Sequence, residues 1–187
     1  MNQQKAIFLD RDGVINKEIN YLYKIEDFEF IPDTVKALKI LQNLGYLLFI
    51  VTNQAGIARG YYTEHDFNKL NSWMLAKFEA AGIVISDVQY CPHHFESGKG
   101  KYAIDCECRK PKPGMLNTLI KKYNVDVSKS ILIGDKVSDV EAAVSANITT
   151  PVLVKSGHAL PVNIPEYVSC VCENLYTFAR LMETNAS

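Results

Sequence analysis

The feature that most constrains the fold is a regular alternation of short apolar runs with segments of helical periodicity. Runs of strand length occupy residues 6–9, 46–51, 84–90, 130–133, 151–154 and 167–171. Between two of these runs, Leu116, Leu119, Ile120 and Tyr123 recur at the spacing of one helical face. Strands that alternate with helices are typical of a parallel sheet whose two faces are both covered. The sequence therefore predicts an α/β fold.

The expected helices have recognisable ends and stripes. Pro32 and Asp33 open the first helix and Gly45 closes it. Thr63 to Asp66 resembles a cap, and Phe67, Leu70, Met74 and Phe78 form the stripe that follows it. Ser138 to Glu141 fits a capping box that opens an Ala-rich helix, and a last helix is expected over 174–182.

Length and charge limit the functions that are open to the chain. It has 187 residues, which indicates a single domain over 1–187. Its 20 basic and 21 acidic side chains give a net charge of −1, so no basic field attracts nucleic acid or an anionic membrane surface. No apolar run approaches the roughly 20 residues of a membrane span, and the first residues lack the pattern of a signal peptide. We therefore expect a cytoplasmic protein that binds neither nucleic acid nor membrane.

Polar side chains follow several of the expected strands. In such a sheet, ligands bind beyond the carboxyl ends of the strands. The groups expected at this edge are Asp10 and Asp12, then Thr52 and Asn53, then Arg109 and Lys110 from a long loop, and finally Asp135 and Lys136. Each pair alone is an ordinary turn or cap, but their joint occurrence at successive strand ends indicates a site.

These residue types suit phosphoryl transfer. Three carboxylates would repel one another without a cation, and hard oxygen ligands suit Mg²⁺. Lys110 and Thr52 can bind the remaining phosphoryl oxygens. One carboxylate can attack phosphorus, and a second carboxylate two residues later can protonate the leaving oxygen and then activate water.

Several stretches resemble the motifs of the haloacid dehalogenase (HAD) superfamily in its phosphatase form. The first motif is Phe8–Asn16, the second is Thr52-Asn53, the third is Lys110, and the fourth is Gly134-Asp135 with Asp139. More narrowly, the chain is similar to the D-glycero-D-manno-heptose 1,7-bisphosphate phosphatases over about residues 6 to 155. The stretches that carry this resemblance are 10–16, 52–60, 90–94, 106–111, 113–115 and 134–136.

The resemblance implies a fold and a set of roles. The fold would be a Rossmann-like parallel sheet with helices on both faces and a minimal cap or none. Asp10 would be the nucleophile, Asp12 the general acid and base, and Thr52 and Lys110 the groups that stabilise the phosphoryl group. Mg²⁺ would be held by Asp10, the Asp12 carbonyl and Asp135, whereas Asp139 is expected to cap its helix. Expected substrate contacts are Glu18, Ile19, Asn20, Tyr21, Thr52, Asn53, Gln54, Ala55, Arg109, Lys110 and Lys136.

A second metal is expected in the long loop, over about residues 91–108. Cys91, His93 or His94, Cys106 and Cys108 supply four nitrogen and sulfur ligands, which suit tetrahedral Zn²⁺. The resemblance assigns His93 rather than His94. Such a zinc would be structural, because a closed site would pin the loop and position Arg109 and Lys110, which follow the last ligand.

The implied activity is the hydrolysis of the 7-phosphate of D-glycero-D-manno-heptose 1,7-bisphosphate by a monomer, in ADP- or GDP-heptose biosynthesis. A histidinol-phosphate phosphatase is the alternative, since Glu18 and Tyr21 could receive an aminoalkyl imidazole. A receiver-type signalling domain phosphorylated on aspartate belongs to another class. The chain length, the Cys/His loop and the second acid after Asp10 argue against that class.

Overall fold

Six parallel strands form one sheet in the computed structural model, which describes residues 3–186. The strands are β1 (Ala6–Leu9), β2 (Leu47–Asn53), β3 (Ile85–Cys91), β4 (Ile131–Gly134), β5 (Thr150–Val154) and β6 (Cys170–Cys172). Their order across the sheet is β3-β2-β1-β4-β5-β6, and every neighbouring pair is parallel. The predicted parallel sheet is confirmed.

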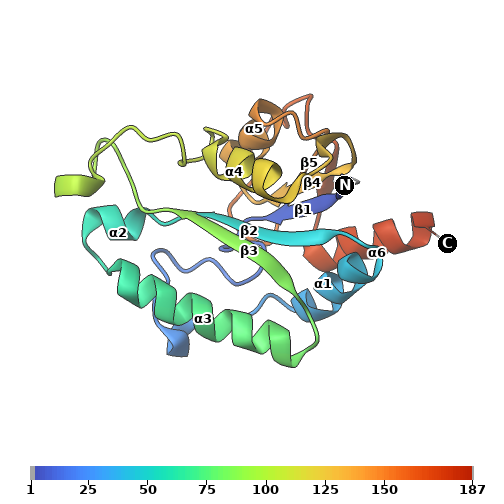
Figure 1. Ribbon diagram of the computed structural model, residues 1–187, viewed down its shortest axis with the longest axis horizontal. Coiled ribbons are helices and arrows are strands. Elements are labelled where there is room, and N and C mark those ends of the chain that lie inside the picture. Colours follow the sequence, from blue (N-terminus) through green and yellow to red (C-terminus); the bar gives the residue numbers. More distant parts are fainter. Residues whose placement is uncertain (1–2, 187) are drawn as a thin grey trace.

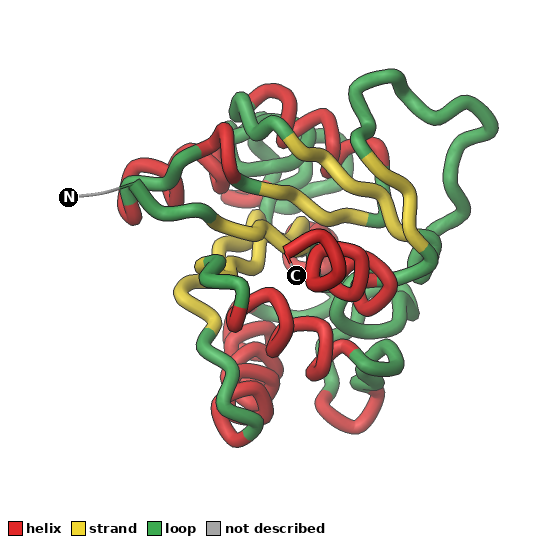
Figure 2. The backbone as a smooth tube through the Cα atoms, turned by 90° about the vertical axis from the view of Figure 1, so that its right-hand side faces the viewer, coloured by secondary structure: helices red, strands yellow, loops and turns green. Residues whose placement is uncertain are grey.

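Helices cover both faces of this sheet (Figure 1). They are α1 (Thr34–Asn43), α2 (Ala55–Arg59), α3 (Glu64–Ala80), α4 (Gly114–Tyr123), α5 (Val137–Ser145) and α6 (Leu175–Ala186). Helices α1, α3 and α6 pack on one face, and α4 and α5 pack on the other. Figure 2 shows the same arrangement after a quarter turn, with helices above and below the strands.

The short strand β1 shows why the sequence reads as continuous apolar runs. Ile7 and Leu9 join the core against α1 and α6, whereas Ala6 and Phe8 join the core against α4 and α5. All four side chains are fully buried. A strand that is covered on both faces needs no polar positions, so the period-2 alternation of a half-exposed strand is absent.

Two local expectations are corrected, and one helix was missed. The last strand is β6 at 170–172 instead of 167–171. Helix α2 was not predicted, because five residues are too few to show a periodic pattern. The expected capping box at Ser138 is wrong. The chain turns into α5 directly after β4, so the N-cap is Lys136, whose backbone N–H donates to Asp139 Oδ2 at 3.0 Å. Ser138 therefore already lies inside the first turn.

The order of the strands places a cleft between β1 and β4. Chain connections leave these two neighbours in opposite directions along the sheet, which opens a crevice at their carboxyl ends. Asp10 follows β1 and donates its backbone N–H to the carbonyl of Ile133 in β4, at 2.9 Å. Asp135 follows β4 directly. Two of the expected acids are thus brought together by the sheet itself.

No separate cap domain is seen in residues 3–186. The segment between β1 and α1 contains a single 3-10 turn, Ile25–Asp27, and the segment after β2 leads directly into α2 and α3. The expectation of a minimal cap or none is confirmed. None of the described helices combines the length and apolar character that crossing a membrane requires.

Candidate active site

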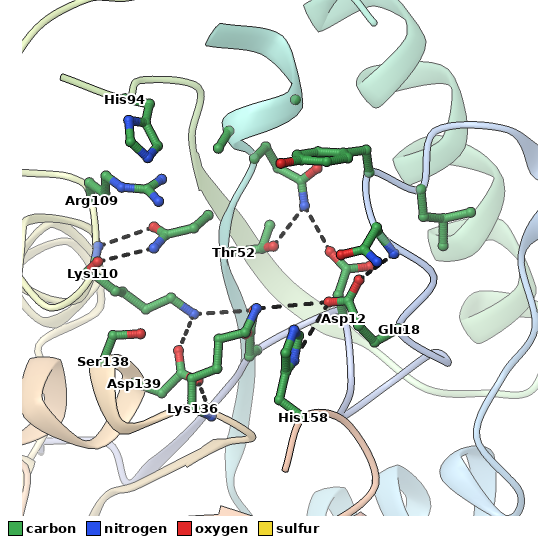
Figure 3. Close-up of a pocket in the computed structure, with 18 of the residues that line it drawn as sticks. Asp12, Glu18, Thr52, His94, Arg109, Lys110, Lys136, Ser138, Asp139 and His158 are labelled. Atoms are coloured by element: carbon green, nitrogen blue, oxygen red, sulfur yellow. Dashed lines mark hydrogen bonds and ion pairs between the residues drawn. The ribbon is translucent and has the colours of Figure 1, made fainter. Parts of the chain in front are cut away.

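A cavity of about 460 Å³ opens at the carboxyl ends of the central strands (Figure 3). The lining comes from the end of β2, from α2 and α5, and from the loops after β1, β3, β4 and β5. These residues are Asp10, Asp12, Glu18, Asn20, Tyr21, Leu22, Thr52, Asn53, Gln54, Ala55, Gly56, Arg59, Tyr62, His94, Arg109, Lys110, Pro111, Lys136, Ser138, Asp139 and His158. Most of the residues singled out in the sequence therefore share one pocket.

Lys110 is the central cation of the pocket. Its side chain is almost fully buried, and its Nζ lies 2.6 Å from Asp139 Oδ1 and 3.1 Å from Asp10 Oδ1. Nζ also donates to the carbonyl of Val51 at 2.8 Å. The Asn53 amide holds the backbone of Lys110 in both directions, because it accepts from the N–H and donates to the carbonyl, each at 3.1 Å. Lys110 is therefore fixed at both ends.

This arrangement shifts the protonation equilibria of the paired groups. Burial raises the pKa of Asp10 to about 6, although the Lys110 ammonium opposes the rise. Burial alone would lower the pKa of Lys110, but the Asp10 and Asp139 carboxylates outweigh it and raise that pKa. Lys110 is thus held firmly in its charged form beside Asp10.

Asp12 lies in a different hydrogen-bond environment. The Arg11 guanidinium contacts both of its carboxylate oxygens at 2.9 Å, and Asn16 Nδ2 donates to Oδ1 at 2.9 Å. Gln54 Nε2 donates to Oδ2 at 3.1 Å. Burial alone would raise the pKa of Asp12, but Arg11 and these donors outweigh it, so the pKa lies below its usual range. Two acids on neighbouring positions of one loop therefore have pKa values pushed apart.

The Gln54 amide is oriented by a tyrosine. Tyr62 donates its hydroxyl proton to Gln54 Oε1 at 2.5 Å, which leaves Gln54 Nε2 to donate to Thr52 Oγ1 at 2.8 Å as well as to Asp12. Asn53 and Gln54 were expected as substrate contacts, and both line the cavity. Their side-chain amides also form hydrogen bonds within the protein and hold Lys110, Thr52 and Asp12 in place.

The carboxylates at the floor of the pocket fit a divalent cation. One oxygen of each of Asp10, Asp135 and Asp139 lies within 4.8 Å of the others. Asp139 Oδ2 accepts from the Lys136 N–H, and Asp139 Oδ1, which accepts no hydrogen bond, is neutralised by its 2.6 Å ion pair with Lys110. Within the described part of the chain, the buried Asp135 Oδ1 has no hydrogen-bond partner. A free buried carboxylate oxygen beside Asp10 is the donor that a hard metal ion requires.

The expected sulfur and nitrogen ligands also converge. The three thiol sulfurs of Cys91, Cys106 and Cys108 lie 3.1–3.4 Å apart, and His93 Nδ1 lies 3.4 Å from the Cys108 sulfur. A tetrahedral site with Zn–S bonds of about 2.3 Å has ligand separations of roughly 3.8 Å, so the four atoms need little movement to enclose a metal. His94 is outside this group and lines the pocket instead.

The cysteine cluster leads directly into the pocket. Arg109 and Lys110 follow Cys108, and Arg109 Nη1 donates to the carbonyl of His93 at 3.3 Å. The backbone N–H of Gly114, at the start of α4, donates a hydrogen bond to the Glu107 carbonyl at 2.9 Å. A metal that fixed the four ligands would therefore also fix the positions of the Arg109 and Lys110 side chains.

The rim of the pocket contains most of the expected substrate residues. Glu18, Asn20 and Tyr21 come from the loop after β1, and Ala55, Arg109 and Lys136 line other walls. Ile19 does not line the cavity, and 47% of it is exposed to solvent. Among the expected substrate contacts, Ile19 is the one that the structure places outside the pocket lining.

The structure adds residues that the sequence reasoning missed. Arg59 lines the cavity with His94 and Arg109. The pKa of His94 is lowered, mainly by burial and further by the positive charges of Arg109 and Arg59. Figure 3 shows His94 and Arg109 together at one end of the pocket and Glu18 and His158 near the other. Arg59 could have been found from its place in the stretch after Thr52. His158 carried no motif signal, because it follows Asp135 by 23 residues.

Comparisons with known proteins agree with this site. A family model described as HAD-hydrolase-like matches residues 107–176. The D,D-heptose 1,7-bisphosphate phosphatase of B. bronchiseptica, solved with magnesium and phosphate, superposes with a TM-score of 0.83 at 30% identity. That match covers 97% of this chain and 99% of the solved one. The fold and the pocket thus define a phosphatase of the HAD class.

Curated relatives narrow the family. A D-glycero-alpha-D-manno-heptose-1,7-bisphosphate 7-phosphatase of Photorhabdus laumondii is 46% identical over 97% of this chain and 98% of its own. A beta-named counterpart from Pasteurella multocida is 44% identical over 96% of this chain and 97% of its own. The chain belongs to the D-glycero-D-manno-heptose-1,7-bisphosphate 7-phosphatase family.

The pairing of Lys110 predicts a large effect on stability. The variant Lys110→Met should lower the free energy of unfolding by roughly 3–5 kcal/mol, because it leaves the buried Asp10 and Asp139 without their cation. Urea unfolding without added metal measures the change. Lys122→Met is the control, since its solvent-exposed ion pair with Asp87 should contribute little to stability. Equal effects of the two variants would contradict the assigned importance of Lys110.

Proposed function

We propose that this protein hydrolyses the 7-phosphate of D-glycero-D-manno-heptose 1,7-bisphosphate through a phosphorylated aspartate, in the synthesis of nucleotide-activated heptose. The observation that carries the proposal is the position of Asp10 against Lys110 at the floor of the pocket, 3.1 Å apart. The relatives described above are named for this reaction. The histidinol-phosphate and receiver-domain alternatives are not favoured by them.

The proposed reaction has two halves. In the first, an Asp10 oxygen attacks phosphorus and the bond from phosphorus to the sugar oxygen breaks. Asp12 gives that oxygen a proton, so its carboxyl group, which is held ionised in the free protein, must be protonated in the substrate complex. In the second, Asp12 takes a proton from water while the water oxygen attacks phosphorus. The bond from phosphorus to Asp10 then breaks, which releases inorganic phosphate and restores Asp10. Lys110 and Thr52 pair with the phosphoryl oxygens throughout.

Two metals belong to the proposal. Asp10, the Asp12 carbonyl and Asp135 would hold Mg²⁺, which when bound supplies positive charge to the phosphoryl oxygens. The free Asp135 Oδ1 supports this assignment. Cys91, His93, Cys106 and Cys108 would hold a structural Zn²⁺, supported by the short separations of their ligand atoms.

The second phosphate of the substrate would lie at the cationic end of the pocket. Arg109 is the expected contact, and Arg59 and His94 line the same cavity. Guanidinium groups bind phosphate through paired hydrogen bonds. Asn20 and Lys136 remain available for the sugar and its reacting phosphate. The two relatives carry opposite anomers in their names, so anomer preference needs its own measurement.

We further propose that the enzyme acts as a monomer in the cytoplasm. A reducing compartment keeps cysteine thiols out of disulfides and so leaves them able to bind zinc, which supports the cytoplasmic assignment.

The proposed nucleophile gives the first functional prediction. Asp10→Asn should lower kcat by roughly 10³-fold or more, because an amide cannot form the acyl phosphate. Phosphate release measures turnover, and circular dichroism checks the fold. Asp33→Asn is a matched control at the start of α1, outside the pocket lining, and should retain wild-type activity. Turnover of Asp10→Asn near the wild-type rate would contradict the covalent mechanism.

The substrate assignment is tested by competition between phosphate esters. The heptose 1,7-bisphosphate should be hydrolysed with a higher kcat/KM than histidinol phosphate. Arg109→Ala should lower kcat/KM for the bisphosphate by roughly 10–100-fold, the worth of a charged hydrogen bond. Arg180→Ala, on the exposed side of α6, is the control. A higher kcat/KM for histidinol phosphate would overturn the substrate assignment while leaving the phosphatase class intact.

The zinc assignment predicts one Zn²⁺ per purified chain. Cys108→Ser should lose this metal and lower activity, because residues 91–108 no longer hold Arg109 and Lys110 in place. Elemental analysis and limited proteolysis of the loop measure the two effects. Cys170→Ser, whose thiol lies on β6 outside the cluster, should keep its zinc. Normal kinetics in a zinc-free Cys108→Ser protein would count against the assignment.

A further inference from the structure

The loop after β5 makes unusually close contacts with the floor of the pocket. Ser156 Oγ donates to the carbonyl of Gly13 at 2.7 Å. A Cβ atom on Gly157 would lie 2.1 Å from Asp135 Oδ2, and one on Gly13 would lie 2.4 Å from the same oxygen. Only glycine fits at either position without displacing the carboxylate. The loop is therefore built to approach Asp135.

The close approach of this loop brings His158 into contact with Asp135. Its backbone N–H donates to Asp135 Oδ2 at 2.9 Å, and its ring Nδ1 lies 2.6 Å from the same oxygen. A carboxylate oxygen accepts protons, so Nδ1 must carry its hydrogen in this contact. Both donors converge on Oδ2, and neither reaches Oδ1.

The two oxygens of Asp135 are thereby made unequal. Oδ2 is saturated by His158, whereas the buried Oδ1 has no hydrogen-bond partner among residues 3–186. Because Asp135 is only 1% exposed, water does not compensate Oδ1 from bulk solvent. The carboxylate is held in one orientation with a single oxygen left over.

We propose that His158 is a positioning residue that orients the Asp135 carboxylate toward a divalent cation. This inference rests on the proposed function, because it takes Asp135 as a ligand of the catalytic Mg²⁺. A hydrogen bond to the second oxygen of a ligating carboxylate fixes its rotation and leaves the first oxygen aimed at the metal. Such supporting contacts are typically worth 10–100-fold in metal affinity.

A purely structural role for His158 makes a different prediction. The side chain is 38% exposed and lines the cavity, so it is not a packed core group. If it only held the loop after β5, its removal would lower thermal stability without a specific effect on metal binding. If it positions Asp135, metal affinity falls and the effect depends on the hydrogen-bond donor.

The test is Mg²⁺ binding by calorimetry to the purified protein, dialysed without added Mg²⁺ and without substrate. His158→Ala should weaken Mg²⁺ binding by 10–100-fold. His158→Asn should recover most of the affinity, since its Nδ2 can donate from nearly the same place as the ring Nδ1. The Mg²⁺ concentration that gives half-maximal activity should rise by the same factor as the dissociation constant. His65→Ala, on the exposed side of α3, is the matched control and should bind as the wild type does.

The outcomes separate this inference from the proposed function. Mg²⁺ affinity of His158→Ala within twofold of the wild type would overturn the positioning role. Equal losses in His158→Ala and His158→Asn would overturn the hydrogen-bond explanation. A wild-type protein that binds Mg²⁺ but does not hydrolyse the heptose bisphosphate would refute the proposed substrate and leave His158 in its role. No Mg²⁺ binding by the wild type would refute both.

Discussion

The buried ion pairs of Lys110 are the interaction on which the site depends. A charged amine almost without solvent contact is tolerable only because Asp139 and Asp10 lie 2.6 and 3.1 Å from it. The same contact commits one oxygen of Asp139 and neutralises part of the charge beside Asp10. Asp135 Oδ1, in contrast, has neither a hydrogen-bond partner nor an ion pair among the described residues, so this oxygen is left for a second cation.

The position of Lys110 is in turn imposed by elements far away in the chain. Asn53, at the end of β2, clamps its backbone, and the Cys/His cluster ends two residues before it. A long loop would otherwise carry a high conformational entropy cost for placing one ammonium group. A cluster of fixed ligands would restrict the loop and so reduce the conformational freedom that Lys110 has to lose. The sulfur-rich loop therefore supports the chemistry without contributing a reacting group.

Recognition must come from the rim, because no cap domain covers the cavity in the described chain. The two ends of the pocket differ in charge: Arg59, His94 and Arg109 gather at one end, while Glu18 and His158 lie near the other. A substrate with two phosphates could place one at Lys110 and the other at the guanidinium groups of Arg59 and Arg109. The side-chain amides of Asn53 and Gln54, at the same pocket, also hold Lys110, Thr52 and Asp12 in place.

The sequence by itself determined the parallel sheet and the acids that follow its strands, because short apolar runs and the residues after them are local features of the sequence. It also predicted that Asp139 caps α5, which the structure confirms, but it placed the N-cap at Ser138 instead of Lys136. It could not show that Gln54 faces inward or that His158 meets Asp135. Those contacts join residues that are distant in the chain, and only the packing of loops across the sheet decides which polar atoms form hydrogen bonds and that Asp135 Oδ1 does not.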